Sequence, residues 1–473
     1  MCAIAGACSH NPEVDAVHRT LSALDATQHR GDASTGIASL SYDNELDVHT
    51  HPGLVRHAYP EERIAEMAGS VAIGHNRYPT SGNGNLTQPI LMNSLGLAFA
   101  HNGTLADTDD LKLLLGKKHV DTKRLNDSGM MAEALAQFMY SGKDAPEAVA
   151  ELFPYLRGAA SCVVQHQDTL VAFRDPLGLR PLSIAEVDGG YMFSSETCGF
   201  YQSRSKYVGD VKPGEMVVVQ GGQMERHQVM EPDPKFDIFE LIYFASPDSE
   251  MFGHSVGQIR YQLGQELAKQ YPLKGDNYLV VGVPDSGLPI AEGYAHGTGL
   301  QKRDVILKHR YWSGRTFMQK NQLERKKYLE RKFSYIGEAA VGRDVILVDD
   351  SIVRQNTASV ITRLMKRAGA RSVSFLVGSP PIGYPDFSGI DTPSQRELAA
   401  SRFTPEEIRQ KINCKFLGYL SLSGLINATG QPVDVFNLAS FNGDYPYEIG
   451  AHGKKITDSV SLKYLEDAWS EAA

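Results

Sequence analysis

Cys2, the second residue of the chain, carries two groups that could act together in a reaction. The sequence opens Met1-Cys2-Ala3, and removal of Met1 would leave Cys2 with both a thiol and a free α-amine. An α-amine has an ordinary pKa of about 8, so near neutral pH part of it is unprotonated and can accept a proton. A thiol becomes a strong nucleophile once its own proton is gone. Cys2 is therefore a candidate nucleophile with its own base; the alternative is that it is only a small buried side chain.

Two carboxylates in the second half of the chain, Asp349 and Asp350, form a second candidate site. They follow four consecutive apolar residues, 345–348, which predict a buried strand of a parallel sheet. Such sheets bind ligands at the carboxyl ends of their strands. A polar loop and an amphipathic helix follow, with Thr357 as the expected N-cap, and the N–H groups at a helix start suit a phosphate. Adjacent carboxylates can bind ribose hydroxyls, either directly or through Mg²⁺. The alternative is that the strand simply ends in two solvated acidic side chains.

Five clusters of polar residues lie in the first half of the chain, between Cys2 and the two carboxylates. They stand where apolar runs end, which is where functional groups gather in folded proteins. Each cluster has an ordinary interpretation, because Asn-Gly favours hairpin turns, Asn before a helix is a cap, and a single loop Arg is usually solvated. Their joint order after Cys2 is what points to a site. The clusters cover residues 29–36, 74–80, 100–105, 126–128 and 174–182.

Length and composition describe an ordinary globular protein. The chain has 473 residues, which suggests two to three domains, with 42% hydrophobic and 22% charged residues. A net charge of −9 argues against a general nucleic-acid-binding surface. The five Cys residues form no CxxC pair, which favours a reducing, cytoplasmic location over a disulfide framework or a zinc site. No apolar run is long enough for a membrane span, which needs about 18 residues.

The elements that must position the first-half clusters can be expected from the apolar pattern. Short apolar runs bounded by turn residues predict strands, and longer periodic runs predict helices. We expect Asn11 to cap the first helix, with Pro12 at its first position. Sheets with helices packed on them are the expected layers. The predicted strands cover 70–74, 96–100, 161–165, 169–173 and 216–220, and the predicted helices cover 12–28, 127–140 and 145–153.

Together with Cys2, these clusters resemble the glutamine amidotransferase domain of the N-terminal-nucleophile type. The resemblance implies a four-layer αββα sandwich with Cys2 at the end of a central strand. It implies that Cys2 attacks the amide of glutamine, while the Asn102 side chain and the Gly103 N–H stabilise the oxyanion. Arg77 would bind the α-carboxylate of glutamine and Asp127 its α-ammonium group. A thioester would form, releasing ammonia and then glutamate.

Three positions depart from that family's usual pattern. The common Cys-Gly opening is Cys2-Ala3, and Asp32 replaces the usual Gln of His-Arg-Gly-Gln. Gly129 stands where the family has Glu after Asp-Ser. None of these changes removes a residue needed for the thioester chemistry, but the rate and the glutamine affinity stay open.

A linker rich in Pro and charge, residues 231–235, marks the expected domain boundary. Strand, turn and helix then alternate to about residue 380, which predicts a parallel sheet wrapped by helices. The first elements of this half are a helix over 256–270, a strand over 278–282 and a turn over 283–287. We expect an amidotransferase domain over 2–230, a second domain over 236–450 and a helical tail over 451–473.

The stretch around the two carboxylates resembles the phosphoribosylpyrophosphate (PRPP) signature of type I phosphoribosyltransferases. A basic segment before it, beginning near Lys308, matches one branch of that family. The resemblance implies Mg²⁺ as a cofactor, with Asp349, Asp350 and Ser286 as candidate ligands. The residues that it implies for PRPP binding are Asp349, Asp350, Ser351, Arg354, Gln355, Asn356, Thr357, Lys308 and Arg315.

With both halves in this order, the chain resembles the amidophosphoribosyltransferase family over residues 2–445. The implied reaction moves ammonia from glutamine to C1 of PRPP, giving 5-phosphoribosylamine, glutamate and pyrophosphate, the first step of de novo purine synthesis. We expect the ammonia to cross an interdomain channel that PRPP binding completes. Tyr78 is a candidate lever or channel wall, and the alternative is a core aromatic.

Two departures leave alternatives open in the second half. The family's phosphate loop usually ends Gly-Thr-Thr, whereas this chain has Gln355, Asn356 and Thr357. Loss of the Gly restricts the backbone near the 5′-phosphate, although Asn tolerates left-handed geometry and its amide can donate. The segment 311–314 is one residue longer than usual. The chain is then either a divergent enzyme of this reaction, a paralogue that aminates a related sugar phosphate, or a glutaminase with a non-catalytic regulatory domain.

The resemblance also bears on cofactors and partners. Some family members carry a propeptide and an iron–sulfur cluster; we expect neither, because Cys2 follows Met1 directly and Cys198 and Cys414 stand alone. The family implies a homo-oligomer, dimer or tetramer, and inhibition by purine nucleotides. Two rival classes remain: an amidotransferase with a different acceptor, and a catalytically inactive nucleotide sensor.

Overall fold

Apolar runs in the first half of the chain form two stacked antiparallel sheets in the computed structural model. It describes residues 1–11, 15–43, 45–78, 87–203, 205–309, 331–390, 392 and 394–457. One sheet has the order β11-β9-β10-β1-β4-β2-β3, which places β1 (Ala3–Ser9) at its centre and Cys2 at the start of the central strand. The other strands are β11 Lys206–Asp210, β9 Ser183–Val187, β10 Gly190–Ser194, β4 Gly69–Arg77, β2 Ser34–Ser41 and β3 Leu46–Pro52.

The second sheet lies face to face with the first. A buried core that includes Ile4, Ile73, Val163 and Leu170 fills the space between them. Its strands follow the order β13-β12-β8-β7-β6-β5. They are β13 Gln223–Gln228, β12 Glu215–Gln220, β8 Thr169–Arg174, β7 Gly158–His166, β6 Leu97–Leu105 and β5 Ile90–Met92.

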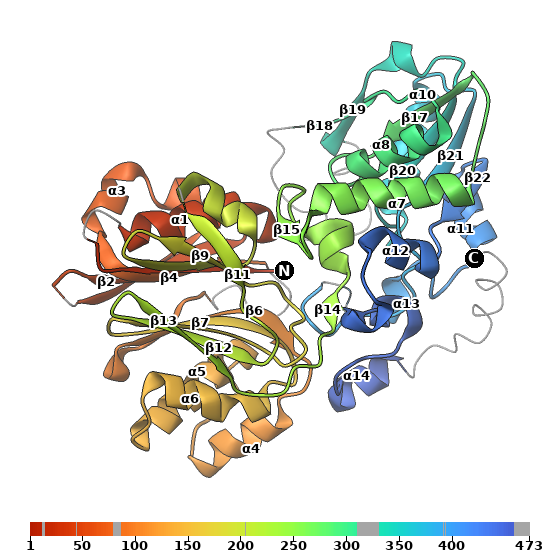
Figure 1. The fold of residues 1–473 in the computed structure, drawn as a ribbon. Helices are drawn as coiled ribbons and strands as arrows, with labels where there is room; N and C mark the ends of the chain where they lie inside the picture. The colour runs from red at the N-terminus through yellow and green to blue at the C-terminus, as the bar shows by residue number, and fades with distance from the viewer. Residues whose placement is uncertain are drawn as a thin grey trace.

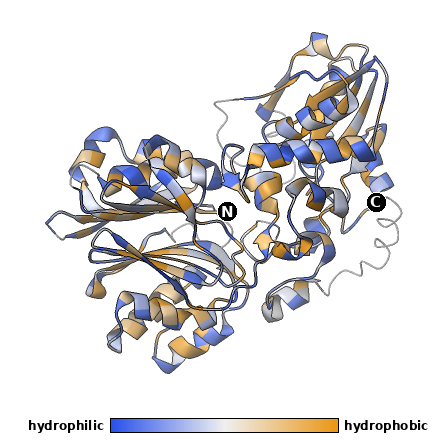
Figure 2. Ribbon diagram, viewed as in Figure 1, coloured by the Kyte–Doolittle hydropathy of each residue, from blue (hydrophilic) through white to orange (hydrophobic). Residues whose placement is uncertain are grey.

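Helices cover the outer faces of both sheets, so the order of layers is helix, sheet, sheet, helix (Figure 1). Apolar side chains of α1, such as Leu21 and Leu24, pack on β1 and β4, and those of α5 and α6 pack on the other sheet. The colouring in Figure 2 shows hydrophobic residues concentrated on the inner strands. The predicted αββα sandwich is confirmed. The helices are α1 Ala16–Ala26, α2 Val55–Ala58, α3 Glu61–Glu66, α4 Asp109–Lys117, α5 Asp127–Tyr140 and α6 Ala145–Leu152.

The second half is built on a parallel sheet of order β17-β20-β21-β22. Alternate residues of β20 face opposite sides: Val345 and Leu347 pack with α10 and α11, whereas Ile346 and Val348 pack with α7 and α8. The continuous apolar run follows from this arrangement, because both faces are covered. The predicted α/β fold of this half is confirmed. The main strands are β17 Tyr278–Gly282, β20 Asp344–Asp349, β21 Ser372–Val377 and β22 Phe416–Tyr419.

Shorter elements complete the second half. A single turn of π-helix, Glu240–Phe244, follows the first short strand. The helices are α7 Val256–Gln270, α8 Gly287–Thr298, α10 Asn356–Arg367, α11 Pro405–Ile412, α12 Leu422–Thr429, α13 Ala439–Asn442 and α14 Gly450–Thr457. The short strands are β14 Phe236–Asp237, β15 Glu250–Met251, β16 His254–Ser255, β18 Ile306–Lys308, β19 Phe333–Tyr335 and β23 Phe436–Asn437.

Two predicted helix caps are wrong. The first helix starts at Ala16, and the side chain of Asp15, not Asn11, accepts a hydrogen bond from the Val17 N–H. Residues 12–14, including the expected Pro at the first position, lie outside the described part. The helix after the carboxylates starts at Asn356 with Gln355 as N-cap, two residues before the expected N-cap Thr357. Of the expected tail, only the part up to Thr457 is described, where α14 ends.

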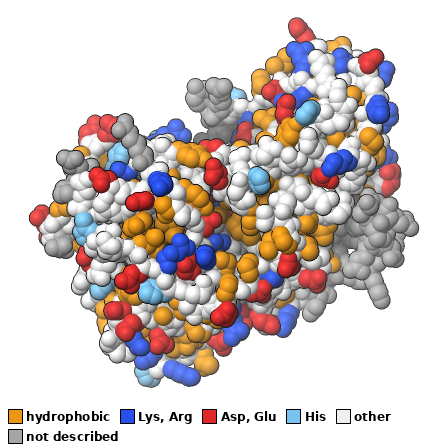
Figure 3. Space-filling model, in the orientation of Figure 1, with side chains coloured by type: hydrophobic (Ala, Val, Ile, Leu, Met, Phe, Trp, Pro, Cys, Tyr) orange, Lys and Arg blue, Asp and Glu red, His pale blue; other side chains and the backbone are white. Residues whose placement is uncertain are grey.

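Helix lengths and surface charge bear on membrane and nucleic-acid binding. None of the described helices is long and apolar enough to cross a membrane. Acidic and basic side chains are interspersed over the face drawn in Figure 3, without a continuous basic stripe. That distribution agrees with the net charge of −9 and offers no footprint for a nucleic-acid backbone on this face.

Candidate active sites

The thiol of Cys2 is partly buried beside the end of β4. The backbone N–H of Tyr78 donates to Cys2 Sγ at 3.4 Å. The guanidinium of Arg30 donates from Nε to the backbone carbonyl of Cys2 at 2.9 Å. Because Ala3 pairs with Asn76 across β1 and β4, the sheet register places Cys2 next to Arg77, the last residue of β4. The structure therefore brings three sequence-predicted residues, Cys2, Arg77 and Tyr78, to one edge of the sandwich.

Asn102 and Gly103 lie on the facing sheet, near the end of β6. Asn102 is fully buried, and within the described structure neither its amide nitrogen nor its amide oxygen has a hydrogen-bond partner. An unsatisfied buried polar group costs about 1–3 kcal/mol, so a ligand atom bonded there would relieve that cost. Gly103 has φ of 150°, and a Cβ on it would lie 2.1 Å from the carbonyl oxygen of Ala159. Only glycine fits at this point, because the backbone adopts a geometry that other residues avoid.

Asp127 is the first residue of α5 and is held by backbone donors. Its Oδ2 accepts from the Leu105 N–H at 3.0 Å and its Oδ1 from the Ser128 N–H at 2.9 Å. A carboxylate in the first turn of a helix also interacts favourably with the helix dipole. These bonds tie the helix to the end of β6, two residues beyond Gly103. The predicted N-cap of this helix, Asn126, is confirmed by its bond to the Gly129 N–H.

Two buried histidines, His75 and His101, lie within the electrostatic influence of Arg77 and Asp127. Burial lowers the pKa of His75 to about 3, and the charges of Arg77 and of the chain's amino terminus act in the same direction. Burial also lowers the pKa of His101, against the opposing influence of Asp127. His101 Nε2 donates to the Ala159 carbonyl at 3.0 Å, so its Nδ1 accepts from the Ser128 hydroxyl at 2.9 Å. Both imidazoles are therefore neutral at pH 7 and surround the site without adding charge.

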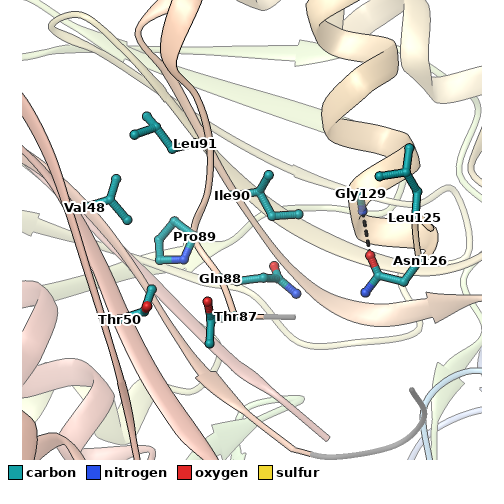
Figure 4. Close-up of a pocket in the computed structure, with 10 residues that line it drawn as sticks. All are labelled: Val48, Thr50, Thr87, Gln88, Pro89, Ile90, Leu91, Leu125, Asn126 and Gly129. Atoms are coloured by element: carbon teal, nitrogen blue, oxygen red, sulfur yellow. Dashed lines mark hydrogen bonds between the residues drawn. The ribbon is translucent and has the colours of Figure 1, made fainter. Parts of the chain in front are cut away.

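A cavity of about 410 Å³ lies beside the N-terminus of α5 (Figure 4). Gln88 connects it to the cluster above, because its amide donates to Ser128 Oγ and accepts from the His101 N–H. Neither Cys2 nor Asn102 is among its lining residues, so the cavity lies beside their site. The lining residues are Val48, Thr50, Thr87, Gln88, Pro89, Ile90, Leu91, Leu125, Asn126 and Gly129.

The carboxylate pair lies, as expected, at the carboxyl end of β20. Asp349 and Asp350 are both 6% exposed. Asp350 accepts from the hydroxyls of Ser286 and Ser351, each at 2.5 Å. Burial raises the pKa of both carboxyls, and the charge of Asp350 raises that of Asp349 further. A bound cation would offset this cost, so the residues present fit Mg²⁺ held by two carboxylates together with ligand oxygens.

The loop after the carboxylates has an unusual backbone. Gln355 adopts a left-handed conformation, with φ of 63° and ψ of −15°. Asn356, which tolerates left-handed geometry, does not adopt it here, because it is the first residue of α10. Arg354 donates from Nε to Glu397 at 2.8 Å. The left-handed turn lies at the position where the resembling family carries Gly.

The basic segment is described only in part. Lys308, the last residue of β18, forms an ion pair with Asp285, the neighbour of Ser286. Sequence reasoning missed Lys332, which interacts electrostatically with Lys308, Asp349 and Asp350 and whose pKa is lowered chiefly by burial. Its position just after a basic run was the available signal. Arg315 and the insertion at 311–314 lie outside the described residues.

Sequence reasoning also missed a buried ionic cluster where the two halves meet. Arg30, Glu196, Arg180 and Glu240 are all fully buried, and they join residues from both halves. Arg30 and Arg180 belong to the polar clusters at 29–36 and 174–182, but no role was predicted for either. Glu240 gave the clearest signal, because it is a lone charge within the apolar run 238–242.

Comparisons with known proteins cover both halves of the chain. The sequence pattern of a glutamine amidotransferase domain matches residues 75–202. An amidophosphoribosyltransferase from Synechocystis sp. is 38% identical, with 93% of this chain and 90% of the relative covered. One from Methanocaldococcus jannaschii is 35% identical, with 95% and 98% covered. Such agreement over nearly the full length of both chains shows common family membership.

Solved structures give the same result for the fold. The glutamine PRPP amidotransferase from B. subtilis, complexed with ADP and GMP, superimposes with a TM-score of 0.86 and 33% identity. It covers 95% of this chain and 98% of its own. A structure described as the allosteric regulatory enzyme of purine biosynthesis gives 0.87 and 33%, with 97% and 99% covered. Both the sandwich and the parallel sheet therefore have counterparts, in the same order, in one protein.

Proposed function

Because this chain belongs to the amidophosphoribosyltransferase family, we propose that it transfers ammonia from glutamine to C1 of PRPP. The products are 5-phosphoribosylamine, glutamate and pyrophosphate, and the step is the first of de novo purine synthesis. One observation carries this proposal: the likeness to these enzymes spans both halves, so neither the glutaminase part nor the PRPP part stands alone. The domains that perform the two half-reactions are proposed to cover 2–230 and 236–450, with the tail at 451–473.

We propose that the first half-reaction occurs at Cys2. The thiolate attacks the amide carbon of glutamine, and the negative charge that develops on the oxygen is stabilised by the Asn102 amide and the Gly103 N–H. Collapse of this intermediate breaks the C–N bond, and ammonia leaves with a proton from the α-ammonium of the mature first residue. Water then cleaves the thioester to give glutamate. Arg77 and Asp127 hold the two charged ends of glutamine; the proposal is supported by the buried, unpartnered amide of Asn102.

We propose that the second half-reaction occurs at the carboxyl end of β20. Ammonia attacks C1 of PRPP from the face opposite the pyrophosphate, which leaves with inversion. Asp349 and Asp350 bind the ribose hydroxyls, and the loop of Ser351, Arg354, Gln355, Asn356 and Thr357 binds the 5′-phosphate. Lys308 and Arg315 balance charge on the pyrophosphate. Asp349, Asp350 and Ser286 would hold Mg²⁺, which when bound neutralises negative charge on the leaving group.

Further properties follow from the family as proposals. Ammonia passes inside the molecule, with Tyr78 beside Cys2 as lever or channel wall. The enzyme assembles as a dimer or tetramer in the cytoplasm and has no nucleic-acid partner. Purine nucleotides inhibit it; the relative from B. subtilis was solved with ADP and GMP bound, which supports this. No iron–sulfur cluster is required.

One observation keeps a second candidate function in view. Gln355 is left-handed at the position where the resembling family carries Gly, so the proposed 5′-phosphate loop carries a side chain there. A paralogue that aminates a related sugar phosphate would account for such a change. Reaction with PRPP, compared with other phosphorylated sugars, separates the two.

The direct test pairs two substitutions that should fail in opposite ways. Cys2→Ala is expected to abolish glutamine-dependent product and to spare synthesis from added ammonium. Asp349→Ala is expected to abolish PRPP-dependent pyrophosphate release and to spare basal glutamine hydrolysis. The measurements are pyrophosphate and glutamate release with each nitrogen source. Loss of both activities in both variants would rule out two separate sites.

Matched controls come from the same strands. Cys8 is a buried cysteine of β1, away from the strand end that carries Cys2. Asp344 lies at the opposite end of β20 from Asp349, where it pairs with Arg371. Cys8→Ala and Asp344→Ala should each retain both activities, which separates loss of chemistry from loss of fold.

A further inference from the structure

The backbone of Cys2 is held by a guanidinium that carries no role in the chemistry above. Arg30 is fully buried, and its Nε donates to the Cys2 carbonyl at 2.9 Å. Burying a guanidinium requires charged partners, because an unpaired buried charge is very costly. Arg30 has two: its Nη1 donates to Glu196 at 2.6 Å and to Glu240 at 2.9 Å, and its Nη2 donates to Glu240 at 2.8 Å. The orientation of the Nε that holds Cys2 is thus fixed from both sides.

The two carboxylates are not equivalent. Glu196 follows β10 in the same half as Cys2 and is shared with other donors: His29, Ser249 and the Ser246 N–H. Glu240 comes from the second half, at the start of the π-helical turn, and gives both oxygens to Arg30. A two-pronged contact of this kind fixes the plane of a guanidinium as well as its position. Glu240 is therefore the partner that sets how Arg30 faces Cys2.

The turn that carries Glu240 is anchored close to the carboxylate site. Arg260 of α7 is 1% exposed and donates to the carbonyls of Leu241, within the turn, and of Ala245, which follows it. Asp350 interacts electrostatically with Arg260. The N-terminus also lies at the junction of the two halves in Figure 1. Buried hydrogen bonds thus run from Arg260 through the turn and Arg30 to Cys2, and the Arg260 end of this set lies within the electrostatic influence of Asp350.

A second contact between the halves reaches the oxyanion site. Arg180 forms an ion pair with Glu240 at 3.6 Å and donates to the carbonyl and hydroxyl of Ser388, both at 3.0 Å. The neighbouring Gly389 is so close that a Cβ on it would lie 3.6 Å from the carbonyl carbon of Gly103. Both sides of the proposed glutamine site are therefore in contact with residues of the second half.

We propose that Glu240 is a positioning residue of the glutamine site: supplied by the PRPP half, it orients Arg30 and through it the backbone of Cys2. The inference rests on the proposed function of Cys2 and deepens it by naming the contact through which the second half controls the nucleophile. A small shift of the π-helical turn, transmitted by Arg260 when the carboxylate site is filled, would rotate Arg30 and change the aim of the thiolate. Short π-helical turns are frequent at functional sites.

The test uses Glu240→Gln, which keeps the shape but removes the charge. The rate of glutamine hydrolysis is expected to fall roughly tenfold to a hundredfold, because a displaced nucleophile loses its attack geometry. The KM for glutamine should change little, and synthesis of product from ammonium should stay as in the unmodified protein. The rate at which iodoacetamide alkylates Cys2, measured by mass spectrometry, should respond to added PRPP and Mg²⁺ in the unmodified protein. In Glu240→Gln this response should be lost.

Two further variants separate positioning from general stability. Asp237→Asn removes another buried carboxylate that pairs with Arg180 at 2.5 Å but makes no bond to Arg30, so it should leave the PRPP response intact. Glu240→Asp keeps the charge and should recover part of the lost rate. An equal fall in ammonium-dependent and glutamine-dependent synthesis by Glu240→Gln would overturn the proposal and mark Glu240 as a scaffold residue. A PRPP effect on Cys2 alkylation that is unchanged in Glu240→Gln would also overturn it.

The alkylation measurement also separates this proposal from the proposed function. If the unmodified protein makes no product from PRPP with either nitrogen source, the function is wrong. The effect of Glu240→Gln on the reactivity of Cys2 can still be read in that case, because it needs no turnover. An alkylation rate identical in both proteins would then overturn the positioning role by itself.

Discussion

At the scale of single residues, the glutamine site is defined by what its buried groups lack. Asn102 is enclosed at the end of β6 without a hydrogen-bond partner in the described structure, whereas His101 before it and Asp127 nearby are both hydrogen-bonded. Folding gains nothing from such a group, so its retention points to a partner that arrives with the substrate. An oxyanion that exists only during the reaction is a partner of that kind.

Replacement of Asn102 by Ala should therefore affect the rate and not the binding of glutamine. We expect kcat for glutamine hydrolysis to fall about 10²–10³-fold, the usual consequence of removing one oxyanion donor, with little change in KM. Steady-state kinetics of glutamate release provide the measurement. A higher KM with unchanged kcat would instead make Asn102 a glutamine-binding residue. Ser161→Ala, on the strand that pairs with Asn102, is a buried control.

The sequence was informative about residues that act and silent about residues that support them. Cys2, Arg77, Asn102 and Asp127 lie in motifs whose chemistry is local, so their types and order were enough to propose roles for them. Arg30 and Glu240 contact each other across 210 positions of sequence, and only folding reveals the pair. A lone charge in an apolar run signals that a partner exists, but not which one.

At the scale of elements, the parallel strand β20 and the helix α10 determine the second site. The apolar run of β20 was predictable because both of its faces are covered, and its carboxyl end necessarily presents Asp349 and Asp350. The start of α10 was not predictable to the residue. Thr is a better N-cap than Gln by propensity, but the left-handed turn at Gln355 starts the helix earlier.

Gln355 also offers a test of the phosphate loop. A left-handed backbone costs a non-Gly residue roughly 1 kcal/mol, so Gln355→Gly should stabilise the loop and lower the KM for PRPP several-fold. Gln167→Gly is the matched control, because this Gln is also left-handed, with φ of 52°, but lies in the turn between β7 and β8. It should raise stability without changing the KM. A higher KM in Gln355→Gly would show that the Gln side chain itself helps to bind the substrate.

At the scale of the whole molecule, the αββα sandwich and the parallel-sheet half meet over buried charge. The αββα sandwich and the parallel sheet were predictable from periodicity and from the family resemblance, and both are confirmed. Their mutual orientation was not, since it depends on the contacts of Arg30 and Arg180 with Glu240 and Ser388. Those contacts place the Cys2 end of the sandwich against the second half, as internal transfer of ammonia requires.

Internal transfer is the central claim, and an isotope competition tests it most directly. The enzyme is given PRPP, Mg²⁺ and glutamine labelled with ¹⁵N in the amide, together with an excess of unlabelled ammonium, and the amine of the product is analysed by mass spectrometry. We expect the ¹⁵N enrichment of the product amine to equal that of the glutamine amide, because the ammonia released at Cys2 never mixes with the solvent. Dilution of the label to the ratio of bulk ammonium, or absence of the aminated product, would contradict the account.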